Sequence, residues 1–249
     1  MTVNTLVIAS PRRVRSSTDQ RIQKACVWCG VAYAVLLFAG LIIAGWLPPP
    51  SPSRTAAQVG ADYSRHSGRI LVGVLLMSLG TGLFAPFVVG MSHQLRRIGE
   101  HVSALATVEL ICGSLAALQG LMPCMFWASA AYRPERSPEI TQSLDDMAWL
   151  PFAGVVILLM IEQVATGVAV LSDRRQKPLF PRWVGYLNFV TPLLLFPASF
   201  DIFVKSGPLA WDGIITFWIP VGIFGVWYVA MAVFMYKAAD RDDDSDLVE

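Results

Sequence analysis

Two glutamates lie inside long apolar stretches of this chain, and their type and position make them the first candidates for chemistry. Glu109 and Glu162 each fall within a hydrophobic run long enough to cross a bilayer. A charged side chain at that depth costs about 2.5 to 3.5 kcal/mol on insertion scales, so such residues are rarely without a role. Gly113, Ala116 and Gly120 follow Glu109 at helical spacing. This stripe of small residues favours close helix packing and an inward-facing carboxyl.

The chemistry expected of these carboxyls is proton donation. Neighbouring antiparallel helices would bring Glu109 and Glu162 near one another, where a dry interior and mutual repulsion both favour the protonated form. At least one would then be a neutral acid at pH 7. We expect Glu162 to be the proton donor or its partner, Glu109 the second acid, and Asp146 a further acid at the outer mouth. The alternatives are a hydrogen bond to a neighbouring helix for each glutamate and a capping box of Ser143 with Asp146.

The composition identifies the class of protein. The 249 residues are 55% hydrophobic and only 15% charged, with a mean hydropathy of +0.54, against about 25% charged residues in an ordinary soluble domain. A net charge of +1 leaves no positive excess for nucleic acid. Cys26 and Cys29 have no second cysteine pair or nearby histidine, and no histidine spacing suits a metal. We predict a membrane protein with no metal, no cofactor and no nucleic-acid partner.

Six apolar runs of about 20 residues predict transmembrane helices. They cover residues 25–46, 70–94, 104–128, 148–171, 183–204 and 213–236. No stretch shows the alternation of a membrane β-barrel strand. We therefore predict an all-α, six-helix transmembrane bundle over residues 25–236. A basic cytoplasmic leader, residues 1–24, would precede it, and an acidic, disordered tail, residues 237–249, would follow.

The distribution of basic residues predicts the orientation. With the N-terminus inside, 13 of the 19 Lys and Arg residues fall in inner segments, so both termini should be cytoplasmic and the protein should span the plasma membrane. In the outer loops, Ser53 would cap a short interfacial helix over residues 53–68, and Asp201 would pair with Lys205. Tryptophans at span ends predict an interfacial belt; these are Trp46, Trp127, Trp149, Trp183 and Trp211.

Polar and aromatic side chains of the second half could line a substrate cavity. Their aromatic faces would stabilise a cationic or unsaturated ligand. The expected lining residues are Trp149, Gln163, Asn188, Phe189, Trp218, Trp227 and Tyr228. The alternative for most of the aromatic residues is a place in the core or against lipid.

Short stretches along the chain carry a resemblance. They are Trp46-Leu47-Pro48-Pro49, the run from Tyr132 to Glu139, Phe180-Pro181-Arg182-Trp183, and the run from Gly207 to Trp211. They resemble a family of small polytopic membrane proteins of actinobacteria. In size, span number and embedded acids the chain is also similar to the small integral-membrane terpene cyclases, including those that close prenylated indoles. The fungal cyclases have seven spans against the six predicted here, so no catalytic residue is transferred from them.

Three functions follow from these patterns. The leading hypothesis is a membrane enzyme that cyclises or isomerises an isoprenoid or prenylated substrate taken from the lipid phase, by protonation and carbocation stabilisation. The alternative is a transporter or small-molecule-binding protein in which Glu109 and Glu162 carry protons. Similarly placed prolines in spans one to three and four to six give a weak sign of inverted repeats. A scaffold subunit of a membrane complex is the third, and it predicts tight packing without a cavity.

Overall fold

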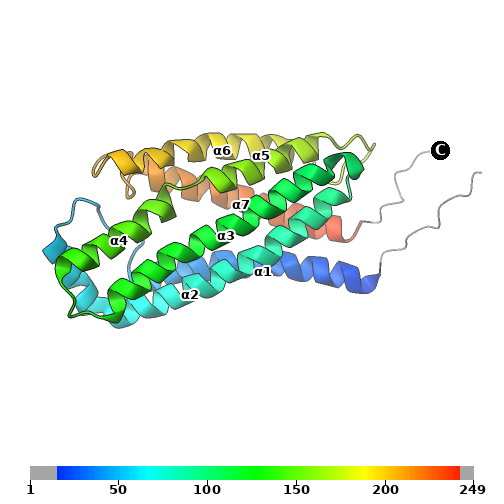
Figure 1. Ribbon diagram of the computed structural model, residues 1–249. Helices are drawn as coiled ribbons and strands as arrows, with labels where there is room; N and C mark the ends of the chain where they lie inside the picture. The colour runs from blue at the N-terminus through cyan, green and yellow to red at the C-terminus, as the bar shows by residue number, and fades with distance from the viewer. Residues whose placement is uncertain (1–15, 242–249) are drawn as a thin grey trace, which may run out of the picture.

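The computed structural model describes residues 16–241, which fold into a bundle of long helices (Figure 1). The helices are α1 (Ser17–Ala44), α2 (Ala56–Arg96), α3 (Ser103–Tyr132), α4 (Pro138–Ala153), α5 (Ile157–Leu171), α6 (Arg182–Leu195) and α7 (Ile219–Ala239), with shorter helical turns η1 (Glu100–Val102), η2 (Phe196–Phe203) and η3 (Ile214–Trp218). Six helical segments are long and apolar enough to cross a membrane, and the described residues contain no strand. The predicted all-α, multi-pass architecture is confirmed. The first fifteen residues of the predicted leader and the predicted tail from residue 242 onward lie outside the described residues.

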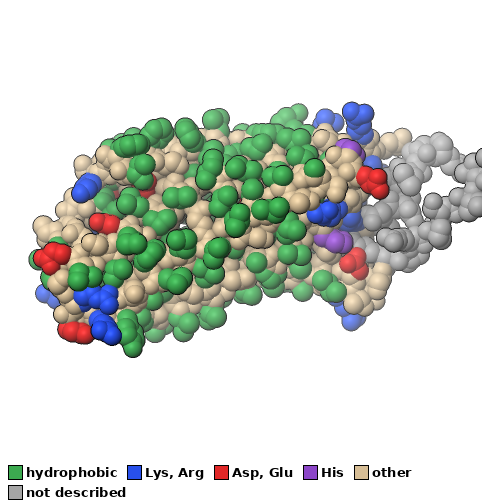
Figure 2. Space-filling model, viewed as in Figure 1, with side chains coloured by type: hydrophobic (Ala, Val, Ile, Leu, Met, Phe, Trp, Pro, Cys, Tyr) green, Lys and Arg blue, Asp and Glu red, His purple; other side chains and the backbone are tan. Residues whose placement is uncertain are grey.

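The face shown in Figure 2 is divided into an apolar middle and two charged ends. Figure 2 shows hydrophobic side chains over the middle of the visible face, with Lys, Arg, Asp and Glu gathered at the two ends. α1 begins and α7 finishes at the same end, which we call the terminal end. The opposite end holds buried tryptophans, and we call it the tryptophan end. An apolar band between charged ends is what a bilayer requires of a protein that spans it.

The first two helices approach closely through glycines. A Cβ atom built on Gly73 would lie 2.5 Å from the carbonyl oxygen of Gly40 and 2.9 Å from Cβ of Ala44. Lipid tails are as apolar as the helix surfaces, so helix association in membranes depends on such close backbone contact. The backbones of α1 and α2 are therefore in close contact along this part of the bundle.

Two predicted helix starts are corrected by the structure. The interfacial helix predicted behind Ser53 is the beginning of the 41-residue α2, which Thr55 caps together with Gln58. No residue between the two predicted segments breaks the helical hydrogen bonding. The capping box predicted for Ser143 and Asp146 is also wrong, because α4 already begins at Pro138 and Ser143 lies inside it.

The fourth predicted span is two helices separated by a short break. α4 ends at Ala153, and α5 begins at Ile157. Pro151 cannot donate a backbone hydrogen bond, which weakens the last turn of α4. Polar side chains satisfy the freed carbonyls: the Ser199 hydroxyl donates to Gly154 O at 2.8 Å, and the Gln119 amide donates to Val155 O.

The fifth span changes its winding before it ends. α6 stops at Leu195, and the chain continues as the 3₁₀ turn η2, in which Asp201 is buried with 2% of its surface exposed. The ion pair predicted between Asp201 and Lys205 is wrong: within the described residues Asp201 forms no ion pair or side-chain hydrogen bond. The tighter winding of η2 turns this carboxyl against Gly154, where a Cβ atom would lie 2.1 to 2.7 Å from the carboxyl atoms of Asp201.

Four of the five predicted belt tryptophans form an internal cluster instead. Trp46, Trp127, Trp149 and Trp211 are each at most 5% exposed. The ring centroids of Trp46 and Trp127 lie 4.6 Å apart, and those of Trp127 and Trp149 lie 5.0 Å apart. Trp183 is half exposed, as a belt residue would be. The cluster closes the bundle at the tryptophan end.

Candidate functional site

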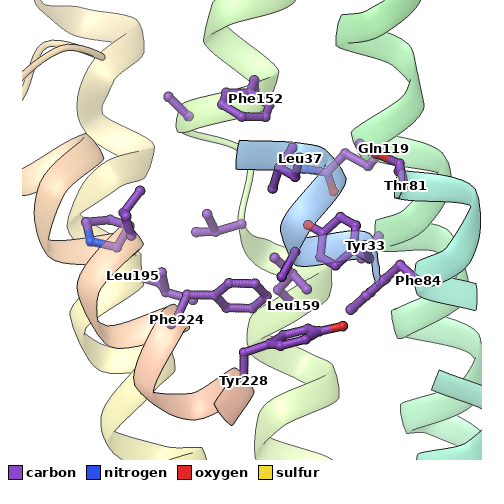
Figure 3. A pocket seen from close by; sticks show the side chains of 18 of the residues that line it. Tyr33, Leu37, Thr81, Phe84, Gln119, Phe152, Leu159, Leu195, Phe224 and Tyr228 are labelled. Atoms are coloured by element: carbon purple, nitrogen blue, oxygen red, sulfur yellow. The ribbon is translucent and has the colours of Figure 1, made fainter. Parts of the chain in front are cut away.

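An apolar cavity of about 350 Å³ lies inside the bundle (Figure 3). Its walls come from α1, α2, α3, the break between α4 and α5, the end of α6, and η3 with α7. Pockets for small molecules in proteins measure about 300 to 1,000 Å³. The cavity is therefore large enough for a small apolar molecule, and nearly every helix contributes to its shape.

Aromatic rings gather at one end of the cavity. Tyr33, Phe84, Phe224 and Tyr228 surround this end, and Phe152 lies at the opposite end (Figure 3). The Tyr33 ring centroid lies 5.1 Å from that of Phe84 and 5.8 Å from that of Tyr228. Ring faces carry partial negative charge and attract cations. This end of the cavity can therefore stabilise a carbocation.

Most of the remaining polar side chains of the lining donate hydrogen bonds to backbone carbonyls. The hydroxyls of Thr81 and Thr216 donate to Met77 O and Leu209 O, each at 2.8 Å, and Gln119 donates to Val155 O. None of the described residues that line the cavity is charged. A ligand would thus meet a hydrocarbon surface almost everywhere except at the two tyrosine hydroxyls and the unpartnered amide oxygen of Gln119.

Irregular backbone lies at the cavity wall. Ala153, Val155 and Val156 come from the break between α4 and α5, while Thr216 and Phe217 come from the π-helical turn η3. Non-helical backbone at membrane depth is tolerated only where protein buries it or where it lines a cavity, and π-turns occur often at functional sites. Regular α-helical hydrogen bonding is thus interrupted in two of the segments that line the cavity.

The two glutamates meet between α3 and α5. Both are fully buried, and neither carboxyl has a hydrogen-bond partner among the described residues. A Cβ atom on Gly113 would lie 3.3 Å from the Glu162 carboxyl carbon, and Glu109 lies one turn away from Gly113 on α3. The two side chains are close enough to interact electrostatically. The predicted inward orientation and proximity of Glu109 and Glu162 are confirmed.

The surroundings of this pair favour neutral carboxyls. The Ser92 hydroxyl faces Glu109, but it donates its proton to Ala106 O at 2.6 Å, so it can only accept from a protonated Glu109. Arg96 lies within electrostatic range of Glu109, but its guanidinium donates to Ser103 and Thr107. A buried, ionised carboxylate with no counter-charge is strongly disfavoured.

Glu162 lies one helical turn beyond the aromatic end of the cavity. Leu159, one turn before it on α5, lines the cavity. Tyr33 and Tyr228 both lie within electrostatic range of Glu162. The buried Tyr228 hydroxyl has no hydrogen-bond partner among the described residues, and a Cβ atom on Gly30 would lie 2.6 Å from it. Tyr33 and Tyr228 are thus the residues of the cavity lining that lie within electrostatic range of the buried acid.

Most of the other predicted site residues lie elsewhere. Trp149 belongs to the tryptophan cluster. Trp227 is fully buried behind Phe224, where its indole N–H donates to Asn188 Oδ1 at 2.8 Å. Phe189 and Trp218 are 37% and 44% exposed on the outer surface of the bundle. Of the seven predicted lining residues, Tyr228 alone lies among the residues that surround the cavity.

The two remaining predicted polar residues also lie outside the cavity lining. Gln163 is fully buried beside Glu162, and its amide has no hydrogen-bond partner within residues 16–241. Asp146 is half-buried on α4 at the tryptophan end and lies within electrostatic range of Lys205. Asp146 is therefore remote from the glutamate pair.

No family model, curated protein or solved structure matches the chain. The resemblance to actinobacterial membrane proteins and to membrane terpene cyclases stays a prediction. Within residues 16–241 no group of three or more His, Cys, Asp or Glu side chains gathers as metal ligands would, and the four cysteines are free. The site consists of the cavity, its two tyrosines and the glutamate pair.

Sequence reasoning missed the place of the partly buried Tyr33 in the cavity lining and the burial of Asp201. Tyr33 lies on α1 among aliphatic residues, and one weak signal marks it: Gly30 and Leu37 at helical spacing place it on an inward face. Asp201 gave a misleading signal, because Lys205 four residues later suggested a surface ion pair. The surroundings of both side chains depend on which helix, distant in the sequence, packs against them.

Proposed function

We propose that this protein is a membrane-embedded enzyme that protonates an apolar, isoprenoid-type molecule and so cyclises or isomerises it. The observation that supports the proposal is the juxtaposition of an aromatic-walled apolar cavity with the fully buried, unpartnered carboxyl of Glu162. Acid-initiated cyclisation needs a neutral acid, protection from water and aromatic faces for the cation. The cavity and its surroundings offer all three.

The proposed reaction is balanced in atoms and charge. Glu162 and the hydroxyl of Tyr33 or Tyr228, which form no hydrogen bond with each other in the structure, must first come within hydrogen-bond distance. Glu162 then gives its proton to that hydroxyl, while the hydroxyl gives its own proton to a carbon of the substrate double bond. A C–H bond forms and a carbocation results, which the rings of Phe84 and Phe224 stabilise. An internal double bond attacks the cation and closes a ring. A proton then leaves the neighbouring carbon and returns along the same route to Glu162, so the product is an isomer of the substrate.

The neighbouring Glu109 helps to keep Glu162 protonated between turnovers. Glu109 and Glu162 can share protons, because ionising both in one dry site would place two negative charges close together. When Glu162 is ionised during turnover, a protonated Glu109 can remain neutral and limit the accumulated charge. Glu109 therefore acts as the second acid and positions the proton on Glu162.

Deuterium incorporation tests the proposal. Membranes that contain the protein are incubated in D₂O with prenylated indoles and linear polyprenols, and products are analysed by mass spectrometry. We expect a cyclic product in which one deuterium replaces one hydrogen, so that its mass is one unit above that of the substrate. Glu162→Gln should reduce the rate by about 10² to 10⁴, the usual contribution of a general acid. Glu139→Gln, an exposed glutamate on α4, is the matched control and should keep full activity. Unchanged turnover in Glu162→Gln would refute the mechanism.

Proton-coupled transport is the second candidate, and the break between α4 and α5 favours it. Discontinuous helices line the binding sites of many transporters, and here the unpartnered Asp201 carboxyl lies against the break at Gly154. Reconstituted vesicles distinguish the two functions: accumulation of an unmodified substrate driven by a pH gradient would support transport. The cavity speaks against the scaffold hypothesis, which predicts tight packing.

We also propose that both termini lie in the cytoplasm and that the membrane is the plasma membrane. The support is the excess of Lys and Arg in the described segments at the terminal end, where 10 of the 16 such residues in the range 16–241 lie, which is typical of cytoplasmic loops. A cysteine introduced at exposed Ser64 in a cysteine-free variant should react with an impermeant thiol reagent in intact cells.

A further inference from the structure

The cavity reaches the surface that lipid covers beside α7. Gly225 and Val229 of α7 line the cavity, and they also line a shallow groove on the outside of the same helix. Val229 is 64% exposed. A residue that lines an internal cavity and is also mostly exposed marks the place where the cavity reaches the surface.

Two sets of contacts define where this opening lies between α1 and α7. Toward the terminal end, Lys24 Nζ lies 2.6 Å from Asp240 Oδ1, and the rings of Tyr33 and Tyr228 are in contact. At the tryptophan end, the Trp211 indole N–H donates to Pro50 O at 2.8 Å, which ties the loop after α1 to the segment before η3. Between these contacts the facing sides of α1 and α7 line the cavity.

The α7 side of the opening lacks bulk. A Cβ atom on Gly222 or Gly225 would have no other atom within 4 Å. The groove that continues outward from Gly225 is apolar throughout; its other lining residues are Trp183, Val226, Val229, Ala230, Val233 and Phe234. No charged or hydrogen-bonding group would hold a polar ligand there except the Trp183 indole. The chemistry along this route suits a hydrocarbon chain.

We propose that a ligand with a long linear hydrocarbon chain enters from the bilayer between α1 and α7, beside Gly225 and Val229. One end occupies the cavity beside Tyr33 and Tyr228, and the rest of the chain lies in the groove of α7 toward Trp183. The substrate class is therefore a prenyl or acyl chain longer than the cavity. The reaction given above rests on this site, but binding of the chain does not require the reaction.

Photo-crosslinking tests the route. The purified protein in phosphatidylcholine nanodiscs is irradiated with geranylgeraniol that carries a diazirine at its hydroxyl end or at its tail, and labelled peptides are identified by mass spectrometry. We expect one probe to label the cavity around Phe224 and the other to label the groove around Val233. Excess unmodified geranylgeraniol should abolish both. Labelling spread evenly over the lipid-facing sides of all helices would overturn the proposal.

Two variants block the opening, and one matched variant does not. Val229→Trp and Gly225→Leu should lower labelling of the cavity by at least about tenfold. Leu75→Trp, at an exposed position of α2 that lines neither the cavity nor the groove, should leave it unchanged. Each variant is compared only if it elutes as a single species and unfolds at a temperature close to that of the wild type. Gly225→Leu should meet this condition, because its side chain extends into open space. Cavity labelling that persists in both blocked variants would refute entry at this place.

The outcome is separable from that of the proposed chemistry. Glu162→Gln should stop product formation while leaving cavity labelling intact. Cavity labelling that depends on Val229 without any isomeric product would support the entry route and refute the enzyme. Product formation that is insensitive to Val229→Trp and Gly225→Leu would support the enzyme and refute the entry route.

Discussion

Replacing Arg54 by methionine should destabilise the tryptophan end strongly, because it leaves a buried carboxylate without its counter-charge. Asp145 is 2% exposed, and its oxygens accept from the Tyr63 hydroxyl at 2.7 Å and from the Arg54 guanidinium at 3.1 Å. Removing one partner of a buried ion pair costs about 3 to 5 kcal/mol. Arg54 keeps 19% of its side chain exposed, so water weakens the pair and the expected loss is about 3 kcal/mol, near the lower limit.

Thermal unfolding in nanodiscs measures this loss. For a chain of this size, about 3 kcal/mol corresponds to a fall of roughly 6 to 12 °C in Tm. Asp145→Asn in the Arg54→Met background removes the orphaned charge and should recover most of the loss. Asp62→Asn is the control: Asp62 also pairs with Arg54, but it is 34% exposed, so its loss should stay below about 1 kcal/mol. The coupling between Arg54 and Asp145 would be refuted if the stability losses of the two single variants, Arg54→Met and Asp145→Asn, sum to the loss of the double variant within about 0.5 kcal/mol.

Two further predictions concern helix packing and a loop carboxylate. Gly73→Ala should lower stability by about 1 to 3 kcal/mol through overpacking against Gly40, whereas Gly68→Ala, in open space on the same helix, should raise it by up to about 1 kcal/mol; equal effects on Tm would contradict this account. Burial would raise the pKa of Asp173, but hydrogen bonds from Arg175 and from the backbone of Leu179 outweigh it and lower the pKa. Its stabilisation is therefore present above about pH 4, the ordinary value, and is lost as pH falls through the lowered pKa, so acid should reduce the Tm of wild type more than that of Asp173→Asn.

The helical spans were predictable because they depend on local composition. Twenty apolar residues in a row have few alternatives to crossing a bilayer. The burial of Glu109 and Glu162 was predictable for the same reason, since an ionisable side chain in such a run turns away from lipid. These inferences need no knowledge of which helices are neighbours.

The cavity and its lining were not predictable, because they depend on contacts between distant segments. Tryptophans at span ends are compatible with a lipid belt and with an internal cluster; only the packing of Trp46 against Trp127 decides between them. The break after Ala153 was missed because Pro and Gly are common in continuous membrane helices. Phe189 and Trp218 were expected at the cavity on residue type alone, and the rotation of their helices turns them outward.

The length of α2 has a consequence for how the molecule stands in its membrane. At 1.5 Å per residue its 41 residues span about 60 Å, roughly twice the hydrocarbon thickness of a bilayer. Lipid tails can surround only about half of this rod. The turns that carry Asp62, Arg65 and His66 must therefore rise among the headgroups or into water, where an antibody fragment bound to them would recognise the protein without entering the bilayer.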